Sequence, residues 1–354
     1  VKIGRKTLRK SKSFTLSDVT PGSIIEYQWQ EVYTEYVPRY NILNFQREFP
    51  IQRVTYFVRP LVHSGFPWTM HAFPFNCNPP AWVQVKEGDR EFVMTSLSNV
   101  PALVDEPDSP SDDEIKQWLL LYYSEENNPD PKKYWPKMGK QFHNEFNSRI
   151  KVNGDVKALT AEAVGSATEP EEQLNQIANF CRTKIKNIGY QTAGITAEDK
   201  TKFKQNPKST SADIAKSRIG TPWEINYLFA AMAQALGFEV RGVKGSTQLS
   251  AQMQPSLPDP YFLKSEFVAV KVKDNWRYFN LDNPYRPAGM IAWDEESVPA
   301  ILLDGKEPKL FQVPASTAQM NTIHRKANLK LDEDGSLSGE VRVMVYGHEG
   351  TRLK

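Results

Sequence analysis

Cysteine is scarce in this chain of 354 residues, which holds only Cys77 and Cys181. We expect the two to lie in different domains, so the sequence does not indicate a disulfide framework. No CxxC pair and no cysteine–histidine cluster is present, so the sequence predicts no zinc site and no other metal or cofactor. Cys181 falls in the middle of a predicted helix, where we interpret it as a small core residue rather than a nucleophile.

Long apolar runs are also absent. No window approaches the ~18 uninterrupted apolar residues that a transmembrane helix needs, and no signal peptide is recognisable. The chain lacks an initiating Met, and both of its ends lie in strand-like patterns. We therefore expect a fragment of a longer protein, for which a missing signal says nothing about location.

Neither sign of charge dominates, because 44 Lys and Arg residues face 42 Asp and Glu residues, for a net charge of +2. This balance gives no electrostatic argument for nucleic-acid binding. The one basic run, at residues 1–12, could bind a polyanion, but we interpret it as a solvated edge strand.

The chain contains 25 prolines against 19 glycines, and many of these prolines punctuate a β-rich N-terminal part. Apolar and polar residues alternate over 25–31 and 49–60, and residues 81–103 predict two strands around a turn at 87–89. Prolines between such strands suit a β-sandwich with edge strands. We therefore predict an all-β sandwich-like domain over residues 1–145, truncated at its N-terminus.

After residue 150 the pattern changes to helical periodicity. Helices are expected at 154–167, 169–187 and 211–220, followed by strands at 238–245 and a strand pair within 264–284. These elements predict an α+β domain over 146–312. A hairpin within 325–350 then indicates the start of a further β domain, 313–354.

One helix has strong local signals at both ends. Thr221 is a suitable N-cap, Pro222 suits the first helical position, and Glu224 completes a Thr-x-x-Glu capping box. Gly237 ends the helix. We expect its apolar face to pack against the strand around 268–272.

Residues 165–290 resemble the transglutaminase-like domain of bacteria, which has a papain-like fold. The family pattern Gly-x-Cys-x-Asp-x-Ala-x-Leu matches the stretch that begins at Gly220, and its cysteine falls on Pro222. The family's histidine begins a strand that corresponds here to EFVAVKV, and it falls on or beside Phe267. The family's aspartate matches Asp282. The resemblance thus implies a domain in which one of three catalytic positions is retained.

The N-terminal part resembles a second family, a β-domain of unknown function that precedes transglutaminase-like domains in many secreted bacterial proteins. Its pattern includes Phe-x-Leu and Pro-Gly-Ser-Ile-Ile-Glu-Tyr, which matches Phe14, Leu16 and residues 21–27. Together, the two resemblances cover about residues 1–310, with both parts in the expected order. The second resemblance implies a periplasmic or secreted location.

Thiol acyl transfer needs a thiolate, a base that forms it, and donors for the oxyanion. Pro222 supplies neither a nucleophile nor a backbone N–H, and Phe267 cannot accept a proton. Asp282 then has no imidazole to orient, and we expect it to cap the turn before Pro284 or to bind backbone N–H groups. We expect Phe267 to fill space against a neighbouring tryptophan, Trp223 or Trp276.

These features predict a non-catalytic protein, a binding or structural module for a peptide, protein or glycan in the cell envelope. The side chains expected near its remnant groove are Trp223, Glu224, Tyr227, Tyr261, Trp276 and Tyr278. The alternative is an active acyl transferase of the cysteine-peptidase or transglutaminase type with an unrecognised nucleophile. Thr221, or a carboxylate pair of Glu224 and Asp282, would then perform the chemistry.

Overall fold

The computed structural model describes residue 13 and residues 15–28, 39–61, 68–78, 81–190, 194–203 and 209–354. The chain divides into two compact units, Val1–Arg39 and Tyr40–Lys354. In the first unit a turn forms at Pro21–Gly22, as the sequence predicts, but residues 23–28 form no strand, so this part of the strand predicted for 25–31 is wrong. The basic run at 1–12 lies outside the described residues.

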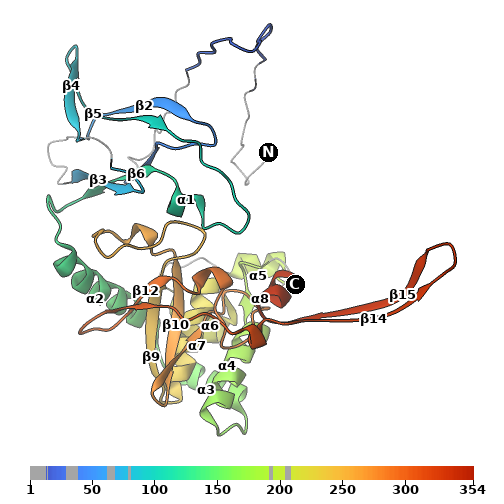
Figure 1. Ribbon diagram of the computed structural model, residues 1–354. Helices are drawn as coiled ribbons and strands as arrows, with labels where there is room; N and C mark the ends of the chain where they lie inside the picture. The colour runs from blue at the N-terminus through green and yellow to red at the C-terminus, as the bar shows by residue number, and fades with distance from the viewer. Residues whose placement is uncertain are drawn as a thin grey trace. The chain divides into compact units, whose positions relative to one another are not determined.

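The second unit begins with a β-rich region of two antiparallel three-stranded sheets (Figure 1). One sheet has the order β1-β6-β3 and the other β2-β5-β4. The strands are β1 (Tyr40–Asn44), β2 (Ile51–Val58), β3 (Thr69–Phe75), β4 (Val83–Glu87), β5 (Arg90–Val100) and β6 (Trp118–Ser124), with a short helix α1 (Asp112–Ile115) before β6. The prediction of a β-rich N-terminal region is confirmed.

Helices dominate from residue 131 to residue 235. After residue 150 this agrees with the predicted change of periodicity, but α2 begins earlier and lies mostly within residues 1–145, where the sequence predicts an all-β domain. They are α2 (Pro131–Arg149), α3 (Gly154–Val164), α4 (Pro170–Lys184), α5 (Ala197–Lys202), α6 (Ser211–Ser217) and α7 (Pro222–Ala235). Two short parallel strands, β7 (Lys186–Asn187) and β8 (Ile219–Gly220), join the segment after α4 to the start of α7.

An antiparallel sheet of five strands completes the α+β region, in the order β11-β10-β9-β12-β13. Its strands are β9 (Glu239–Gly245), β10 (Ser265–Val272), β11 (Asn275–Phe279), β12 (Pro299–Leu302) and β13 (Lys309–Gln312). Three 3-10 turns lie in the connections, η1 (Pro260–Phe262), η2 (Trp293–Glu295) and η3 (Ala318–Met320). Helix α7 packs on β9 and β10 (Figure 1), which confirms the packing expected for the capped helix.

The two faces of this sheet bury different clusters. Val268, Val270 and Val272 share a core with α7, because alternate residues of a strand point to the same face. Phe267 and Ala269 point to the other face, into a smaller cluster. Because of this alternation, only every second residue of β10 points towards α7.

The β-rich region and the α+β region are joined by one continuous core. Trp118 of β6 stacks on Phe75 of β3, with ring centroids 4.1 Å apart, and Phe262 of η1 packs edge-on against Phe75 at 5.2 Å. The Tyr40 hydroxyl of β1 donates a hydrogen bond of 2.8 Å to Asp259. The domain limits expected from the sequence, at residues 145 and 312, stay predictions.

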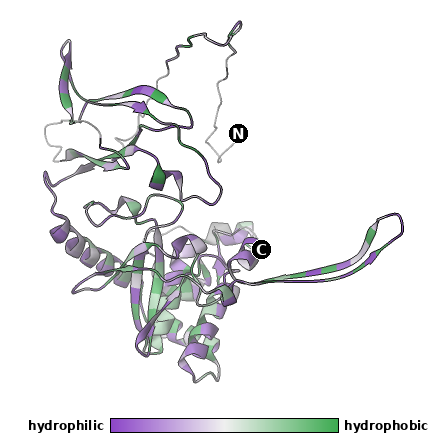
Figure 2. Ribbon diagram, in the orientation of Figure 1, coloured by the Kyte–Doolittle hydropathy of each residue, from purple (hydrophilic) through white to green (hydrophobic). Residues whose placement is uncertain are grey.

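The last strands form the hairpin predicted from the sequence, β14 (Ile323–Leu331) with β15 (Leu337–Val345), and a short helix α8 (Gly347–Arg352) follows. Hydrophobic and hydrophilic residues alternate along both strands (Figure 2). Every residue of the two strands except Val345 is exposed.

Candidate functional site

The start of α7 is built as its sequence predicts. The Thr221 hydroxyl oxygen accepts a 3.4 Å bond from the Glu224 backbone N–H, and the Glu224 carboxylate accepts bonds of 2.8 Å and 3.0 Å from the Thr221 N–H and hydroxyl. Glu224 is only 9% exposed. Its carboxylate is therefore occupied by the cap, which also satisfies the otherwise free N–H groups of the first turn.

Pro222, at the predicted nucleophile position, packs against Gly189. A Cβ atom added to Gly189 would lie 2.7 Å from Cγ and 3.0 Å from Cδ of Pro222. The strand pair β7–β8 holds these two segments together, with the Ile188 N–H donating a 2.9 Å bond to the Gly220 carbonyl oxygen. A saturated ring thus fills the space at the start of the helix where a nucleophile would stand.

A buried polar network lies behind this position. Asn226, one turn along α7 from Pro222, donates to the side-chain oxygen of Asn280 at 2.9 Å and accepts from the Leu281 N–H at 2.7 Å. Asn280 in turn donates to both carboxylate oxygens of Glu295, at 2.8 Å and 3.0 Å. Burial raises the pKa of Glu295 to about 7. These hydrogen bonds connect the segment after β11 to α7.

Asp282 has a different role from the one predicted. Its carboxylate forms an ion pair with Arg286, which is itself buried, and its carbonyl oxygen accepts a 2.8 Å bond from Asn187. The turn before Pro284 is closed by the next residue, Asn283, which accepts a 2.9 Å bond from the Tyr285 N–H. The residue that caps this turn is therefore Asn283 and not, as predicted, Asp282. The charge of Asp282 is instead balanced by Arg286.

Phe267, at the predicted base position, is fully buried on the face of β10 turned away from α7. Its ring packs against Tyr278 at 6.0 Å between centroids. Trp276, one of the two expected neighbours, packs against the same cluster, and its direct contact with Phe267 stays a prediction. The adjacent Glu266 points to the α7 side, where it accepts a 3.0 Å bond from the Tyr227 hydroxyl. Neither residue supplies an imidazole.

The other groove candidates are not brought together. Tyr227 lines a cavity of about 500 Å³, whereas Trp276 and Tyr278 line a separate cavity of about 340 Å³. Tyr261 packs against Tyr40 of β1, with ring centroids 4.6 Å apart, and Trp223 is 45% exposed. The five aromatic candidates thus lie in four separate places and do not line one common groove.

The Tyr227 cavity combines charges of both signs with aromatic walls. Its lining residues are Phe142, Glu145, Phe146, Ser148, Arg149, Tyr227, Lys244 and Glu266. Glu266 forms an ion pair with Lys244, whose ammonium lies 5.5 Å from the centre of the Phe142 ring. Burial, and then the nearby Glu266 carboxylate, raise the pKa of Tyr227, so its hydroxyl stays a hydrogen-bond donor at neutral pH. Apart from Tyr227, the sequence analysis singled out none of these residues.

Comparison with known proteins finds a family model that matches part of the α+β region. Residues 157–287 match the family model of the transglutaminase-like superfamily. This segment is a transglutaminase-like domain. No curated protein is significantly similar to the chain.

Two solved structures are similar to the chain. One, described as a candidate protease from Parabacteroides distasonis, is 14% identical, with a TM-score of 0.44 and coverage of 78% of this chain and 47% of that chain. This chain therefore spans about half the length of that protein. The other, described as a candidate cysteine protease from Cytophaga hutchinsonii, is 11% identical, with a TM-score of 0.30 and coverage of 86% and 89%.

Neither cysteine is placed to act as the nucleophile of the transglutaminase-like domain. Cys181 is fully buried in α4 against Met232 of α7, and burial raises its pKa. Cys77 lies in the β-rich region after β3, and burial raises its pKa as well. A thiol with a raised pKa has less of the thiolate form that acyl transfer requires.

A serine, a histidine and a carboxylate do meet elsewhere, at Ser316, His348 and Glu296. The Ser316 hydroxyl lies 3.1 Å from the His348 ring atom Nε2, and a Glu296 oxygen lies 2.9 Å from the same atom. A catalytic triad uses the two ring nitrogens separately. This cluster therefore joins α8 to the region before β12 and does not form a triad.

Within the described part of the chain, no group of three or more His, Cys, Asp or Glu side chains could hold a metal ion. The same residues include no helix that is long and apolar enough to cross a membrane.

Proposed function

We propose that this chain is a pseudoenzyme, a non-catalytic transglutaminase-like protein that binds a peptide or a glycan in the cell envelope. The observation that supports it is the pair Pro222 and Gly189. The proline ring fills the start of α7, and no Cβ atom could be added to Gly189 without a clash. A thiolate, its imidazole and a backbone N–H donor are all missing from this position.

The surroundings of Pro222 offer little to a substrate. Glu224 is committed to the helix cap, and Asp282 is paired with Arg286. The neighbouring Thr221 hydroxyl donates to Glu224, which also accepts a bond from the Thr221 N–H. Glu224 is thus within the hydrogen-bond reach that a general base needs, but its carboxylate is buried and is held by the cap. The carboxylates here serve structural roles, which argues against the alternative of an acyl transferase with another nucleophile.

The Tyr227 cavity is the better place for a ligand. Peptides and glycans present neutral donors and acceptors, and the cavity offers two hydroxyls, two carboxylates and two cationic side chains beside the rings of Phe142 and Phe146. Ligand sites commonly combine an aromatic wall with a few fixed polar groups. The periplasmic or secreted location belongs to the same proposal and follows from the N-terminal resemblance.

The catalytic half of the proposal is tested by amine-incorporation and peptidase assays on the purified chain, before and after alkylation with iodoacetamide. We expect no turnover in either case. Turnover that alkylation abolishes would establish a thiol nucleophile. Turnover that survives alkylation would point to Thr221 or to the pair of Glu224 and Asp282, and either result overturns the proposal.

The binding half is tested by calorimetric titration with tetra-alanine and with chitotetraose. Tyr227→Phe removes a single hydroxyl, and we expect it to weaken binding about fivefold or more, as the loss of a hydrogen bond to a ligand does. Tyr278→Phe makes the same change in the other cavity and should leave binding unchanged. Equal effects of the two variants, or no binding of either probe, would contradict the assignment.

A further inference from the structure

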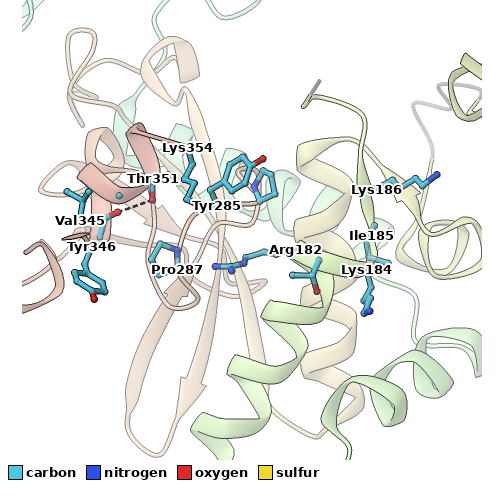
Figure 3. A pocket seen from close by; sticks show the side chains of 14 residues that line it. Arg182, Lys184, Ile185, Lys186, Tyr285, Pro287, Val345, Tyr346, Thr351 and Lys354 are labelled. Carbon is cyan, nitrogen blue, oxygen red and sulfur yellow. Dashed lines mark hydrogen bonds between the residues drawn. The ribbon is translucent and has the colours of Figure 1, made fainter. Parts of the chain in front are cut away.

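A cavity that Pro222 does not line lies between the end of α4 and the C-terminal segment (Figure 3). Its volume is about 730 Å³. The end of α4 and strand β7 form one side, the loop at 284–287 forms the second, and the end of β15 with α8 forms the third. Small-molecule sites typically measure about 300–1,000 Å³, so the cavity has room for such a ligand.

The cavity is basic, although the chain as a whole is nearly neutral. Four cationic side chains, Arg182, Lys184, Lys186 and Lys354, are among its lining residues, and no carboxylate side chain is. Lys186 is paired with Asp199 at 2.8 Å. Among the described residues, no ion pair forms with the other three cations. The cavity thus holds positive charge that nearby carboxylates do not offset.

Of these four cations, Arg182 is the one whose side chain bonds, among the described residues, to the loop at 284–287. In Figure 3 its side chain extends from α4 towards Pro287, and its Nη1 donates to the Arg286 carbonyl oxygen. Its Nε is buried and has no hydrogen-bond partner in the described part of the chain. Burial lowers the pKa of Arg182. A half-buried guanidinium without a counter-ion is costly, and an anion that pairs with it reduces that cost.

The rest of the wall is largely apolar, apart from the hydroxyl groups of two threonines and two tyrosines. Pro284, Tyr285 and Pro287 come from the loop after β11, and Ile185 and Val345 come from the flanking elements. Proline and tyrosine rings beside a guanidinium suit a ligand that has a flat or apolar body next to its charge.

We propose that this cavity binds a small organic anion, in which a carboxylate or phosphate group is attached to an apolar ring or short chain. Arg182 and Lys184 also lie in the last turn of α4, where cations complement the helix dipole. That role does not explain Lys354, which lies 170 positions after Lys184, or the open space between them. Neither Pro222 nor any residue of the Tyr227 cavity lines this cavity, so the inference does not rest on the proposed peptide or glycan binding.

The test is a calorimetric titration of the whole chain with phenyl phosphate, benzoate, inorganic phosphate and neutral benzamide. We expect saturable 1:1 binding of at least one of the two aromatic anions, and no binding of benzamide. Comparing the affinities of phenyl phosphate and benzoate shows whether the cavity prefers a phosphate or a carboxylate group. Inorganic phosphate should bind more weakly than phenyl phosphate. Added salt should weaken the binding, because a partly exposed charge pair is screened.

Variants then locate the site. Arg182→Gln should weaken the anion about tenfold, and Lys184→Glu about threefold or more, whereas Lys157→Glu on the exposed face of α3 should have no effect. If circular dichroism shows that Arg182→Gln does not fold, Lys184→Glu and Lys354→Glu provide the same comparison. The proposal is overturned if neither aromatic anion saturates, if benzamide or inorganic phosphate binds as well, or if the cavity variants bind as the wild type does.

Discussion

Replacing Gly189 with alanine tests whether Pro222 closes the nucleophile position. The new Cβ would lie 2.7 Å from Cγ and 3.0 Å from Cδ of Pro222, and 3.2 Å from the side-chain oxygen of Asn187. A proline ring at the first position of a capped helix cannot turn aside as a flexible side chain can. The backbone of Gly189 is not in the left-handed region, so alanine adds only the clash. We expect a loss of about 1–3 kcal/mol in the free energy of unfolding, as for other overpacked sites.

A double-mutant cycle isolates the contact between the two positions. Urea unfolding, followed by tryptophan fluorescence, would compare the wild type with Gly189→Ala, Pro222→Ala and the double variant. Alanine at 222 removes both clashing ring carbons, so the double variant should be about as stable as Pro222→Ala alone, with a coupling of at least about 1 kcal/mol. Gly154→Ala is the control, because a Cβ there meets nothing within 4 Å. Strictly additive effects of the two substitutions would refute the reasoning.

Three further predictions concern the cap, a buried acid and a thiol. In the same urea titrations, Thr221→Ala should lower the free energy of unfolding by about 1–2 kcal/mol. Thr196→Ala breaks the same kind of capping box in the short helix α5 and should lower the free energy of unfolding by less than about 0.5 kcal/mol. Glu295 has its pKa raised from 4.5 to about 7, so its stabilising contribution is complete below pH 4.5 and is lost as the pH rises through 7. Glu295→Gln stays neutral, and its stability relative to the wild type should therefore rise between pH 5 and 8 by roughly 3 kcal/mol; equal pH profiles would show that this carboxyl titrates normally. Iodoacetamide should leave Cys181 unmodified in the folded protein and alkylate it only in urea, as mass spectrometry of the tryptic peptides would show.

The capped helix shows how far local signals reach. A threonine, a proline and a glutamate within four residues fix the start of α7, because each satisfies or avoids an unpaired N–H of the first turn. These interactions are between near neighbours in the sequence, so the sequence alone predicts them. The same holds for the turn between β4 and β5 and for the hairpin of β14 and β15.

The position opposite α7 on β10 was not predictable to the residue. The sequence places the family's histidine on or beside Phe267, and a shift of one residue moves a strand's side chain to the other face of the sheet. Phe267 lies on the far face, and Glu266 reaches Tyr227. Sequence patterns also could not show that Tyr261 packs on Tyr40, because that contact joins segments more than 200 residues apart.

The polar network behind Pro222 was missed for a similar reason. Asn226 is visible in the sequence as a polar residue within an apolar helix, but the other members of the network, Asn280 and Glu295, are 54 and 69 positions away. Buried polar groups are costly unless each one is paired, so these residues depend on one another even when the helix start has no catalytic group. The network is therefore a structural requirement of this packing, and its presence is no sign of chemistry.

The pairing of these polar groups also bears on where a ligand could bind. The side chains of Asn226, Asn280 and Glu295 are bonded to one another and to the backbone, and none of their described polar atoms is buried without a partner. A ligand that bonded to any of these three side chains would have to break this network, at a cost of about 1–3 kcal/mol for each group left unpaired. Arg182 differs, because its Nε has no partner among the described residues and its charge faces an open cavity. The proposed anion site therefore rests on a donor that is unpaired among the described residues, which the network behind Pro222 does not offer.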